Sequence, residues 1–209
     1  MVRWKDKNMS YVIVGLGNPG EEYAKTRHNS GRIILEAFRR AHALPDWKGK
    51  KGVLVSNGKI GKETILLMLP ELFMNKSGVS LTSVITSAKK AEHLIAVYDD
   101  LDLPLGAFRI SFGRSSGGHK GVESIIRSIR TKDFIRLRVG ISPQTPSGKI
   151  KKPLGEKKTV DFLMGSFNPK EEKALQALSA KINEALEAIV VEGKVVAMNR
   201  FNQVVGSKK

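Results

Sequence analysis

The first apolar run of the chain passes directly into a glycine-rich turn, in the sequence YVIVGLGNPG at residues 11–20. Residues 11–14 have the composition of a buried strand. After the turn, apolar residues recur at helical spacing at Ile33, Ile34, Ala37, Phe38 and Ala41. A strand, a turn and an amphipathic helix in this order are the repeating unit of α/β proteins, so this stretch predicts an α/β fold.

Strands and helices are expected to alternate along the rest of the chain. The hydrophobic pattern predicts strands at 53–56, 64–69, 94–98, 107–112 and 134–141, and helices at 77–89 and 122–129. Together with the first unit, these elements predict a mixed, twisted central β-sheet flanked by helices.

A single domain over residues 11–209 is the expected organisation, behind an N-terminal extension of residues 1–10 that is expected to be disordered. Residues 143–158 are rich in Pro, Gly and Lys without periodicity, which predicts a long loop inside the domain. A last helix follows Asn168, which can cap it because Glu171 is placed to close a capping box, and Gly193 ends it.

Basic side chains outnumber acidic ones, with 36 Lys and Arg against 20 Asp and Glu and a formal net charge of +16 at pH 7. This excess favours a nucleic acid or another anionic surface as partner, and a solubilising surface charge is the simpler alternative.

The absence of cysteine excludes disulfides, thiolate metal sites and a cysteine nucleophile, and it fits a reducing compartment. No stretch of the sequence approaches the roughly 20 apolar residues of a membrane span, and no signal-peptide pattern precedes the first strand. We therefore expect a cytoplasmic protein without a membrane partner.

The spacing of Gly15, Gly17 and Gly20 also matches a dinucleotide-binding turn. That interpretation is disfavoured because Pro19 lacks an N–H and disfavours helical angles at the preceding residue. The acidic residue that such a site needs about 20 positions later would fall inside the amphipathic helix. The glycines instead favour a tight turn that presents Asn18 at the end of a strand.

The best candidate for a general base is His28, in the polar turn TRHN at residues 26–29. An imidazole with a pKa near ~6.5 accepts a proton around neutrality. A capping or surface histidine is the alternative.

Asp99 is the expected partner of this histidine, because it is the first carboxylate after the apolar run 94–98 and a carboxylate can orient an imidazole. Metal binding by Asp99, Asp100 and Asp102, or turn chemistry, is the alternative. Alternation along a strand would send Asp99 and Asp100 to opposite faces, which disfavours a shared metal site.

Two further strand-to-helix junctions carry polar residues suited to a substrate. At residues 73–78, Asn75 can donate to an oxyanion, accept from an attacking water or pair with a peptide, with helix capping as the alternative. At residues 114–121, glycines and basic residues near a helix start suit a phosphate, with a mobile surface loop as the alternative.

Six motifs, in this order, resemble those of bacterial peptidyl-tRNA hydrolases, and the similarity runs from about Tyr11 to Asn202. They are GLGNPG (15–20) with Glu22-Tyr23, TRHN (26–29), FMN (73–75) before Ser77-Gly78, DDLDLP (99–104), GGHKG (117–121) and RLRVG (136–140).

This resemblance implies hydrolysis of the ester between a peptide and the 3′-terminal ribose of tRNA, by a monomer that needs no metal or organic cofactor. Among the expected catalytic residues, His28 would be the base that activates water, and Asp99 would orient the His28 ring. Asn18 and Asn75 would position the peptide, water and carbonyl. The expected contacts with the peptide and tRNA are Tyr23, Phe73, Met74, Asn75, His119, Lys120 and Arg138.

The chain departs from the family pattern at two positions. Lys120 stands where the family usually has asparagine, and Ser111 stands where it often has lysine; Arg109 or Arg114 is expected to compensate for the latter. Some chloroplast RNA-splicing factors of similar fold act as inactive RNA-binding scaffolds, which gives an alternative function. Joint retention of the four expected catalytic residues favours an active enzyme.

Overall fold

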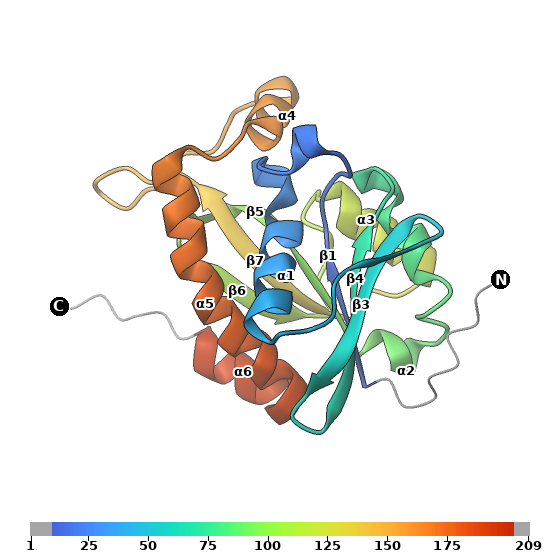
Figure 1. Cartoon of the computed structure of the whole chain (residues 1–209). Helices are drawn as coiled ribbons and strands as arrows, with labels where there is room; N and C mark the ends of the chain where they lie inside the picture. Colours follow the sequence, from blue (N-terminus) through green and yellow to red (C-terminus); the bar gives the residue numbers. More distant parts are fainter. Residues whose placement is uncertain (1–9, 203–209) are drawn as a thin grey trace.

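Within residues 10–202, which the computed structural model describes, the strands form one mixed sheet (Figure 1). They are β1 (Tyr11–Gly15), β2 (Lys48–Lys50), β3 (Val53–Ile60), β4 (Glu63–Pro70), β5 (Leu94–Pro104), β6 (Phe108–Phe112) and β7 (Ile135–Ser142). Their order is β2-β3-β4-β1-β5-β7-β6. β1 pairs in parallel with β4 and β5, and β5 pairs in parallel with β7, whereas β2, β3 and β6 are antiparallel to their neighbours.

Helices cover both faces of this sheet (Figure 1), which confirms the predicted α/β architecture. The α-helices are α1 (Ser30–Ala41), α2 (Ala88–Ala91), α3 (Lys120–Ile129), α4 (Glu156–Met164), α5 (Pro169–Glu192) and α6 (Lys194–Phe201). Short 3-10 helices are η1 (Glu21–Tyr23), η2 (Arg27–Asn29) and η3 (Met74–Leu81).

Side chains of the central strand β1 alternate between two hydrophobic cores. Ile13 packs in one cluster with Phe38 of α1 and with the apolar stripe of α5. Val12 and Val14 belong to the other cluster, with Ile125 of α3 and side chains of η3. Because both faces of the parallel strands are covered, β1 and the first half of β5 are apolar throughout, as the sequence pattern indicates.

The helix predicted at 77–89 is wrong. Residues 74–81 form the 3-10 helix η3, and only residues 88–91 form the single turn α2. Gly78 packs so closely on α3 that a Cβ there would lie 2.2 Å from the carbonyl oxygen of Ser124. Serine and threonine residues between the two helices also compete for backbone hydrogen bonds. Tight packing and local polar contacts therefore override the helical pattern.

The predicted last helix is present, but the segment before it contains an additional helix that was not predicted. The Asn168 side chain caps α5 within a capping box, and the helix ends at Gly193. The loop predicted at 143–158 gives way to α4 after Gly155, so its last residues are helical. None of the α4 residues is buried, which explains why no apolar periodicity reveals this helix in the sequence. Residues 1–9 of the predicted N-terminal extension lie outside the described residues.

Close packing at the start of α1 brings several polar segments to one edge of the sheet. A Cβ at Gly31 would lie 2.2 Å from the carbonyl oxygen of Val97 on β5, so only glycine fits between this helix and strand. The parallel strands β1, β4 and β5 run toward the same edge, where the segments that carry Asn18, Asn75 and Asp99 follow or extend them. The predicted functional residues therefore share one end of the molecule.

In the described part of the chain, the helices are too short or too polar to pass through a lipid bilayer.

Candidate active site

An open cleft of about 1040 Å³ lies at this edge of the sheet. Most of the site residues predicted from the sequence line it, namely Asn18, His28, Phe73, Met74, Asn75, Asp99, His119, Lys120 and Arg138. Tyr23 lies beside the cleft, where its ring meets the half-exposed ring of Phe73 edge-on with 6.4 Å between the ring centroids.

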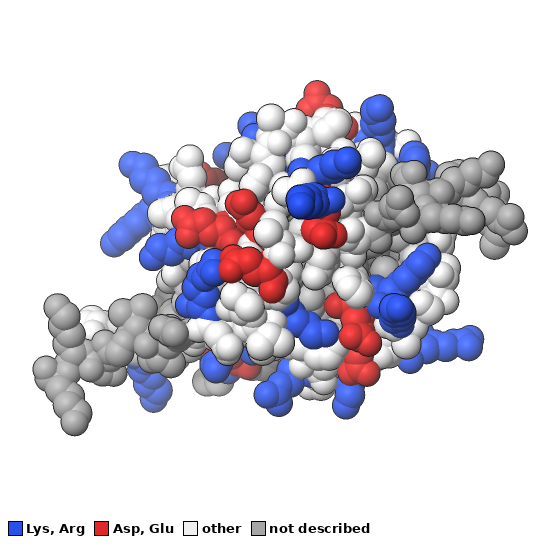
Figure 2. Space-filling model, turned by 90° about the horizontal axis from the view of Figure 1, so that it is seen from below, with Lys and Arg blue, Asp and Glu red and all other residues white. Residues whose placement is uncertain are grey.

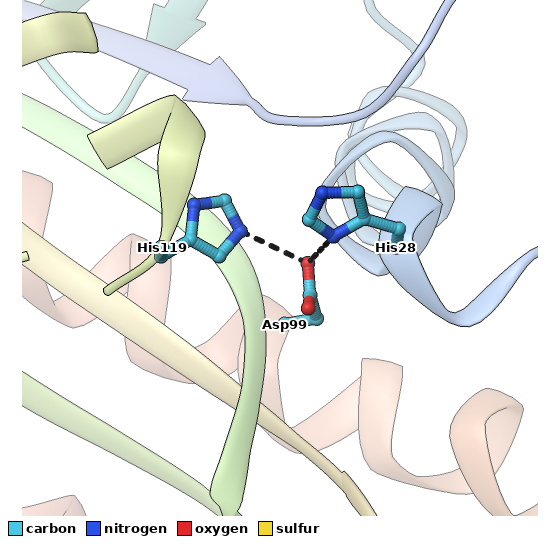
Figure 3. A group of neighbouring side chains, drawn as sticks. All are labelled: His28, Asp99 and His119. Carbon is cyan, nitrogen blue, oxygen red and sulfur yellow. Dashed lines mark hydrogen bonds and ion pairs between the residues drawn. The ribbon is translucent and has the colours of Figure 1, made fainter. Parts of the chain in front are cut away.

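His28 and Asp99 form a hydrogen-bonded pair inside this cleft (Figure 3). His28 Nδ1 lies 2.9 Å from Asp99 Oδ1, and the side chains are 12% and 3% exposed. His28 comes from η2, directly before α1, whereas Asp99 comes from β5, so the pair depends on the close approach of α1 to β5. The pairing expected from the sequence is present in the structure.

The electrostatics of the pair favour an ionised carboxylate. Burial by itself would raise the pKa of Asp99, but the charges and hydrogen bonds of His28 and His119 outweigh it and hold that pKa well below its usual value. Burial would lower the pKa of His28, and the attraction and hydrogen bond of Asp99 outweigh it, so this pKa is raised. Since a carboxylate only accepts, His28 Nδ1 donates the bond and Nε2 is left as the acceptor.

A second histidine binds the same carboxylate oxygen. His119 Nε2 lies 3.1 Å from Asp99 Oδ1, and Figure 3 shows the two rings on either side of that atom. His119 Nδ1 accepts the backbone N–H groups of Gly121 and Val122, so the ring caps α3. The sequence predicts His119 as a substrate contact, and neither the cap nor the bond to Asp99 is evident from its motif.

The cluster of His28, Asp99 and His119 has the composition of a metal site, with one ligand atom from each residue lying within 4.8 Å of the others. The donor chemistry does not fit a metal, because His119 Nδ1 accepts backbone N–H groups and its Nε2 must then carry the proton. The alternative cluster of three aspartates is dispersed, because Asp100 pairs with Arg138 and Asp102 with Lys152.

Asn18 is fixed at the end of β1 by hydrogen bonds on both sides. Its Oδ1 accepts the backbone N–H of Met74 at 2.9 Å, and the Asn29 side chain bonds its backbone N–H and C=O at 2.8 and 2.9 Å. Within residues 10–202, no hydrogen bond engages the Asn18 amide nitrogen, which is therefore free to donate to a ligand. Asn29 is a positioning residue that sequence reasoning missed, although it lies in the TRHN motif.

Asn75 also lines the cleft, on η3, directly after the residue whose backbone N–H binds Asn18. Asn75 is exposed, and within residues 10–202 the one side-chain hydrogen bond to it is the 3.5 Å bond from Arg127 to its backbone carbonyl. Its amide group is therefore free to bind a ligand. Met74, directly before it, is buried and forms part of the wall.

Several basic side chains also line the cleft, among apolar and acidic ones. Arg138 is held by Asp100, and Arg109 and Arg114 also line the cleft, whereas the guanidinium of Arg136 is buried and donates to backbone carbonyls. Lys120, at the first position of α3, is 70% exposed and lies 3.8 Å from Glu123. Ser111 lies among these groups with a buried hydroxyl that has no hydrogen-bond partner in the described part of the chain. The cleft thus joins a histidine–carboxylate site to a wall suited to phosphates.

The positive charge is not uniform over the molecule. The face seen from below in Figure 2 carries Asp and Glu side chains among its Lys and Arg. Pairs such as Lys194–Glu92 and Arg200–Glu192 neutralise part of the basic excess near α6.

A histidine–carboxylate pair and free amide groups lie where the parallel strands of a mixed sheet end, beside basic side chains, and this arrangement defines an α/β enzyme with a hydrolase-type site. The family model for peptidyl-tRNA hydrolase matches residues 12–209. The chain therefore belongs to the peptidyl-tRNA hydrolase family, which confirms the resemblance inferred from its motifs.

Known relatives match nearly the whole chain. The peptidyl-tRNA hydrolase of Chloroflexus aurantiacus is 38% identical over 194 residues, which cover 92% of this chain and 98% of that protein. That of Thermodesulfovibrio yellowstonii is 38% identical over 199 residues, covering 92% and 99%. The crystal structure of peptidyl-tRNA hydrolase from Acinetobacter baumannii is similar with a TM-score of 0.81 at 29% identity, covering 93% of this chain and 96% of that one.

Proposed function

We propose that His28 removes a proton from a water molecule, which attacks the ester carbonyl that joins the peptide to tRNA. Family membership supplies the reaction, the hydrolysis of peptidyl-tRNA to free peptide and tRNA. The observation that carries the mechanism is the 2.9 Å hydrogen bond between His28 Nδ1 and buried Asp99. It leaves Nε2 as the proton acceptor and places a negative charge beside the imidazolium that forms.

The reaction needs only water and the ester as reactants. The water oxygen bonds the carbonyl carbon as its proton moves to His28 Nε2, and a tetrahedral intermediate forms. The bond from this carbon to the ribose oxygen then breaks, and the imidazolium returns the proton to that oxygen. The products are a tRNA with a free 3′-terminal ribose and a peptide carboxylic acid, which releases its remaining proton to solvent and becomes a carboxylate.

Direct attack by water is favoured over a covalent intermediate. Within residues 10–202, the His28 ring makes its only hydrogen bond to Asp99, so no hydroxyl is held where His28 would activate it. The sequence also has no cysteine. An ester is easier to hydrolyse than an amide, so a positioned water and amide donors suffice.

We assign the contacts with the reacting group to Asn18 and Asn75. The Asn18 side chain is fixed by the hydrogen bond from Met74 to its Oδ1, so its amide nitrogen is free to donate to an oxyanion or a peptide carbonyl. The exposed Asn75 amide, which also lines the cleft, can bind the peptide linkage. A peptide offers a neutral N–H and a carbonyl, whereas the free ammonium of an aminoacyl-tRNA does not, so these contacts favour the peptidyl substrate.

We assign tRNA binding to the basic wall, with Arg138 and Lys120 as phosphate contacts. Asp100 orients the Arg138 guanidinium, whereas Lys120 reaches solvent at the start of α3. Tyr23 and Phe73 offer ring faces and edges to the 3′ end and the peptide, with Met74 beneath them. We expect the chain to act as a monomer, as its resemblance to the family implies.

The test uses the full chain and an N-acetylaminoacyl-tRNA. We expect release of the acetylated amino acid and of intact tRNA, and no acylated enzyme in mass spectra of samples quenched during the first turnover. An acyl-enzyme would contradict direct attack by water. Binding of tRNA without release would favour the inactive-scaffold alternative, which neither the fold nor the relatives support. Light scattering should give the mass of one chain, 23.0 kDa.

A further inference from the structure

Both ring nitrogens of His119 are engaged inside the protein. Nδ1 lies 3.2 Å from the backbone nitrogen of Gly121 and 3.3 Å from that of Val122. Nε2 lies 3.1 Å from Asp99 Oδ1, and only 8% of the side chain is exposed. The ring therefore links the start of α3 to the carboxylate that orients His28.

These partners fix the tautomer of His119. A backbone N–H group only donates, so His119 Nδ1 must accept and cannot carry a proton. The single proton of the neutral ring is then on Nε2, which donates to the carboxylate. His28 presents the opposite nitrogen to the same oxygen, since its Nδ1 donates and its Nε2 accepts. The N-terminus of α3 therefore fixes His119 with its proton on Nε2, whereas His28 carries its proton on Nδ1.

We propose that His119 is a positioning residue that limits the proton affinity of His28 by sharing the Asp99 oxygen with it. The inference rests on the proposed role of His28 as the base. A carboxylate oxygen that already accepts one N–H attracts a second cationic donor less strongly. His119 would therefore keep more of the His28 population deprotonated near neutral pH, while it holds the carboxylate in one orientation.

Other charged groups line the cleft but do not bond the shared oxygen. In the described part of the chain, the side chains that hydrogen-bond Asp99 are His28 and His119. Burial raises the pKa of Tyr98, whose ring lies 4.7 Å from that of His119, to about 12, so this neighbour stays neutral. The other charged residues that line the cleft come from β5, β6, β7, α3 and the adjoining loops, and they are Asp100, Asp102, Arg109, Arg114, Lys120, Arg136, Arg138 and Lys152.

Two substitutions separate the two contacts of His119. In His119→Asn, the amide oxygen can occupy the position of Nδ1 and cap α3, but the side chain is too short to reach Asp99. In His119→Gln, the amide nitrogen can occupy the position of Nε2 and donate to Asp99, while the cap is lost. Each variant is therefore the control for the other, and both replace the ring by a neutral amide.

The experiment compares the full-length wild type with both variants by three measurements. The pH titration of the His28 ring is followed by NMR, the kcat/KM for peptidyl-tRNA by its pH profile, and the fold by thermal melting. For His119→Asn we expect His28 to titrate at a higher pH than in the wild type. The acidic limb of the kcat/KM profile should move to higher pH with it, so the ratio of activity at pH 6 to that at pH 8 falls.

For His119→Gln we expect His28 to titrate as in the wild type. The melting temperature should be about 2–4 °C lower, because the cap of α3 is lost.

A His28 titration that is unchanged in His119→Asn, or displaced equally in both variants, would overturn the proposal. So would nitrogen chemical shifts that place the His119 proton on Nδ1 in the wild type at neutral pH. The NMR arm does not depend on catalysis. If the wild-type acidic limb fails to follow the His28 titration, the role of His28 as base is wrong, while the coupling between the two rings is still decided.

Discussion

At the scale of single residues, the chemistry of the site centres on one oxygen of Asp99. This oxygen accepts hydrogen bonds from two histidines although its side chain is almost completely buried. Removing a carboxylate from water is costly, and the two N–H donors offset that cost. The result is a fixed negative charge on Asp99 beside His28, whose Nε2 has a lone pair available to accept a proton.

His28→Ala removes the proposed base. We expect turnover of peptidyl-tRNA to fall by about 10²- to 10⁴-fold, the contribution of a general base, while affinity for tRNA stays near that of the wild type. Single-turnover hydrolysis and binding of uncharged tRNA measure the two effects. His93→Ala is the matched control, because His93 is exposed and lies before the opposite end of β5. An unchanged rate in His28→Ala would remove this residue from the mechanism.

Asp99→Asn removes the charge that raises the pKa of His28. Without that charge the histidine loses its proton at a lower pH, so the acidic limb of the kcat/KM profile should move to lower pH. The rate on the plateau should fall about tenfold or more, but by less than in His28→Ala, because the imidazolium loses its stabilising partner. Asp102→Asn is the control and should leave the acidic limb in place. A wild-type pH profile in Asp99→Asn would contradict the role of this carboxylate.

At the scale of elements, the approach of α1 to β5 decides whether a base and its partner meet. Gly31 occupies the contact between them, and His28 lies in η2 directly before this helix. A second contact joins the start of α3 to β5 through His119. The active site is therefore built where two helix N-termini pack against one strand.

Gly31→Ala should separate α1 from β5, because the new Cβ would lie 2.2 Å from the carbonyl oxygen of Val97. We expect a loss of about 3 kcal/mol in the free energy of unfolding, at the upper end of typical overpacking costs, and a loss of activity from the folded fraction. Urea denaturation measures the first effect. Gly49→Ala is the control, since the nearest atom to its Cβ would be at 3.9 Å, and its unfolding free energy should change by less than about 0.5 kcal/mol. Equal stability of the two variants would show that this contact is not tight.

At the scale of the whole molecule, charge is distributed so that the cleft keeps a basic wall while the face in Figure 2 mixes both signs. The formal net charge of +16 attracts a polyanion such as tRNA to the protein, and we expect the cleft to bind its 3′ end. Binding of tRNA should therefore weaken steeply as salt is added.

Lys120→Asn tests this picture at the position where the chain departs from the family pattern. We expect weaker tRNA binding and a slope of log affinity against log salt that is smaller by about 1, as for the loss of one phosphate contact. The pH profile should change much less than the affinity, because the Lys120 ammonium is 70% exposed and lies beside Glu123 rather than in the histidine cluster. Lys59→Asn makes the same change of charge at the hairpin between β3 and β4, at the opposite edge of the sheet, and should leave the slope near wild type. A change confined to the pH profile of Lys120→Asn would contradict this assignment.

Much of the site could be predicted from the sequence because its residues lie in short motifs at the ends of predictable strands. The pattern at residues 11–20 correctly places a strand and a turn before Asn18, and the apolar run before Asp99 correctly places that carboxylate on β5. The prediction fails at residues 77–89, where contact with α3 overrides local propensity, and at α4, which buries no residue that would give a periodic signal.

The sequence by itself determined the α/β class, the basic character and the motif residues, because these depend on local periodicity and composition. Only the tertiary structure decided that His28 and His119 share one oxygen of Asp99, and that Asn29 fixes Asn18. Such contacts join residues far apart in the chain, and their geometry is set by how closely glycine-bearing helix starts pack on β5. No local pattern encodes that distance, because it is a property of the assembled sheet and its helices.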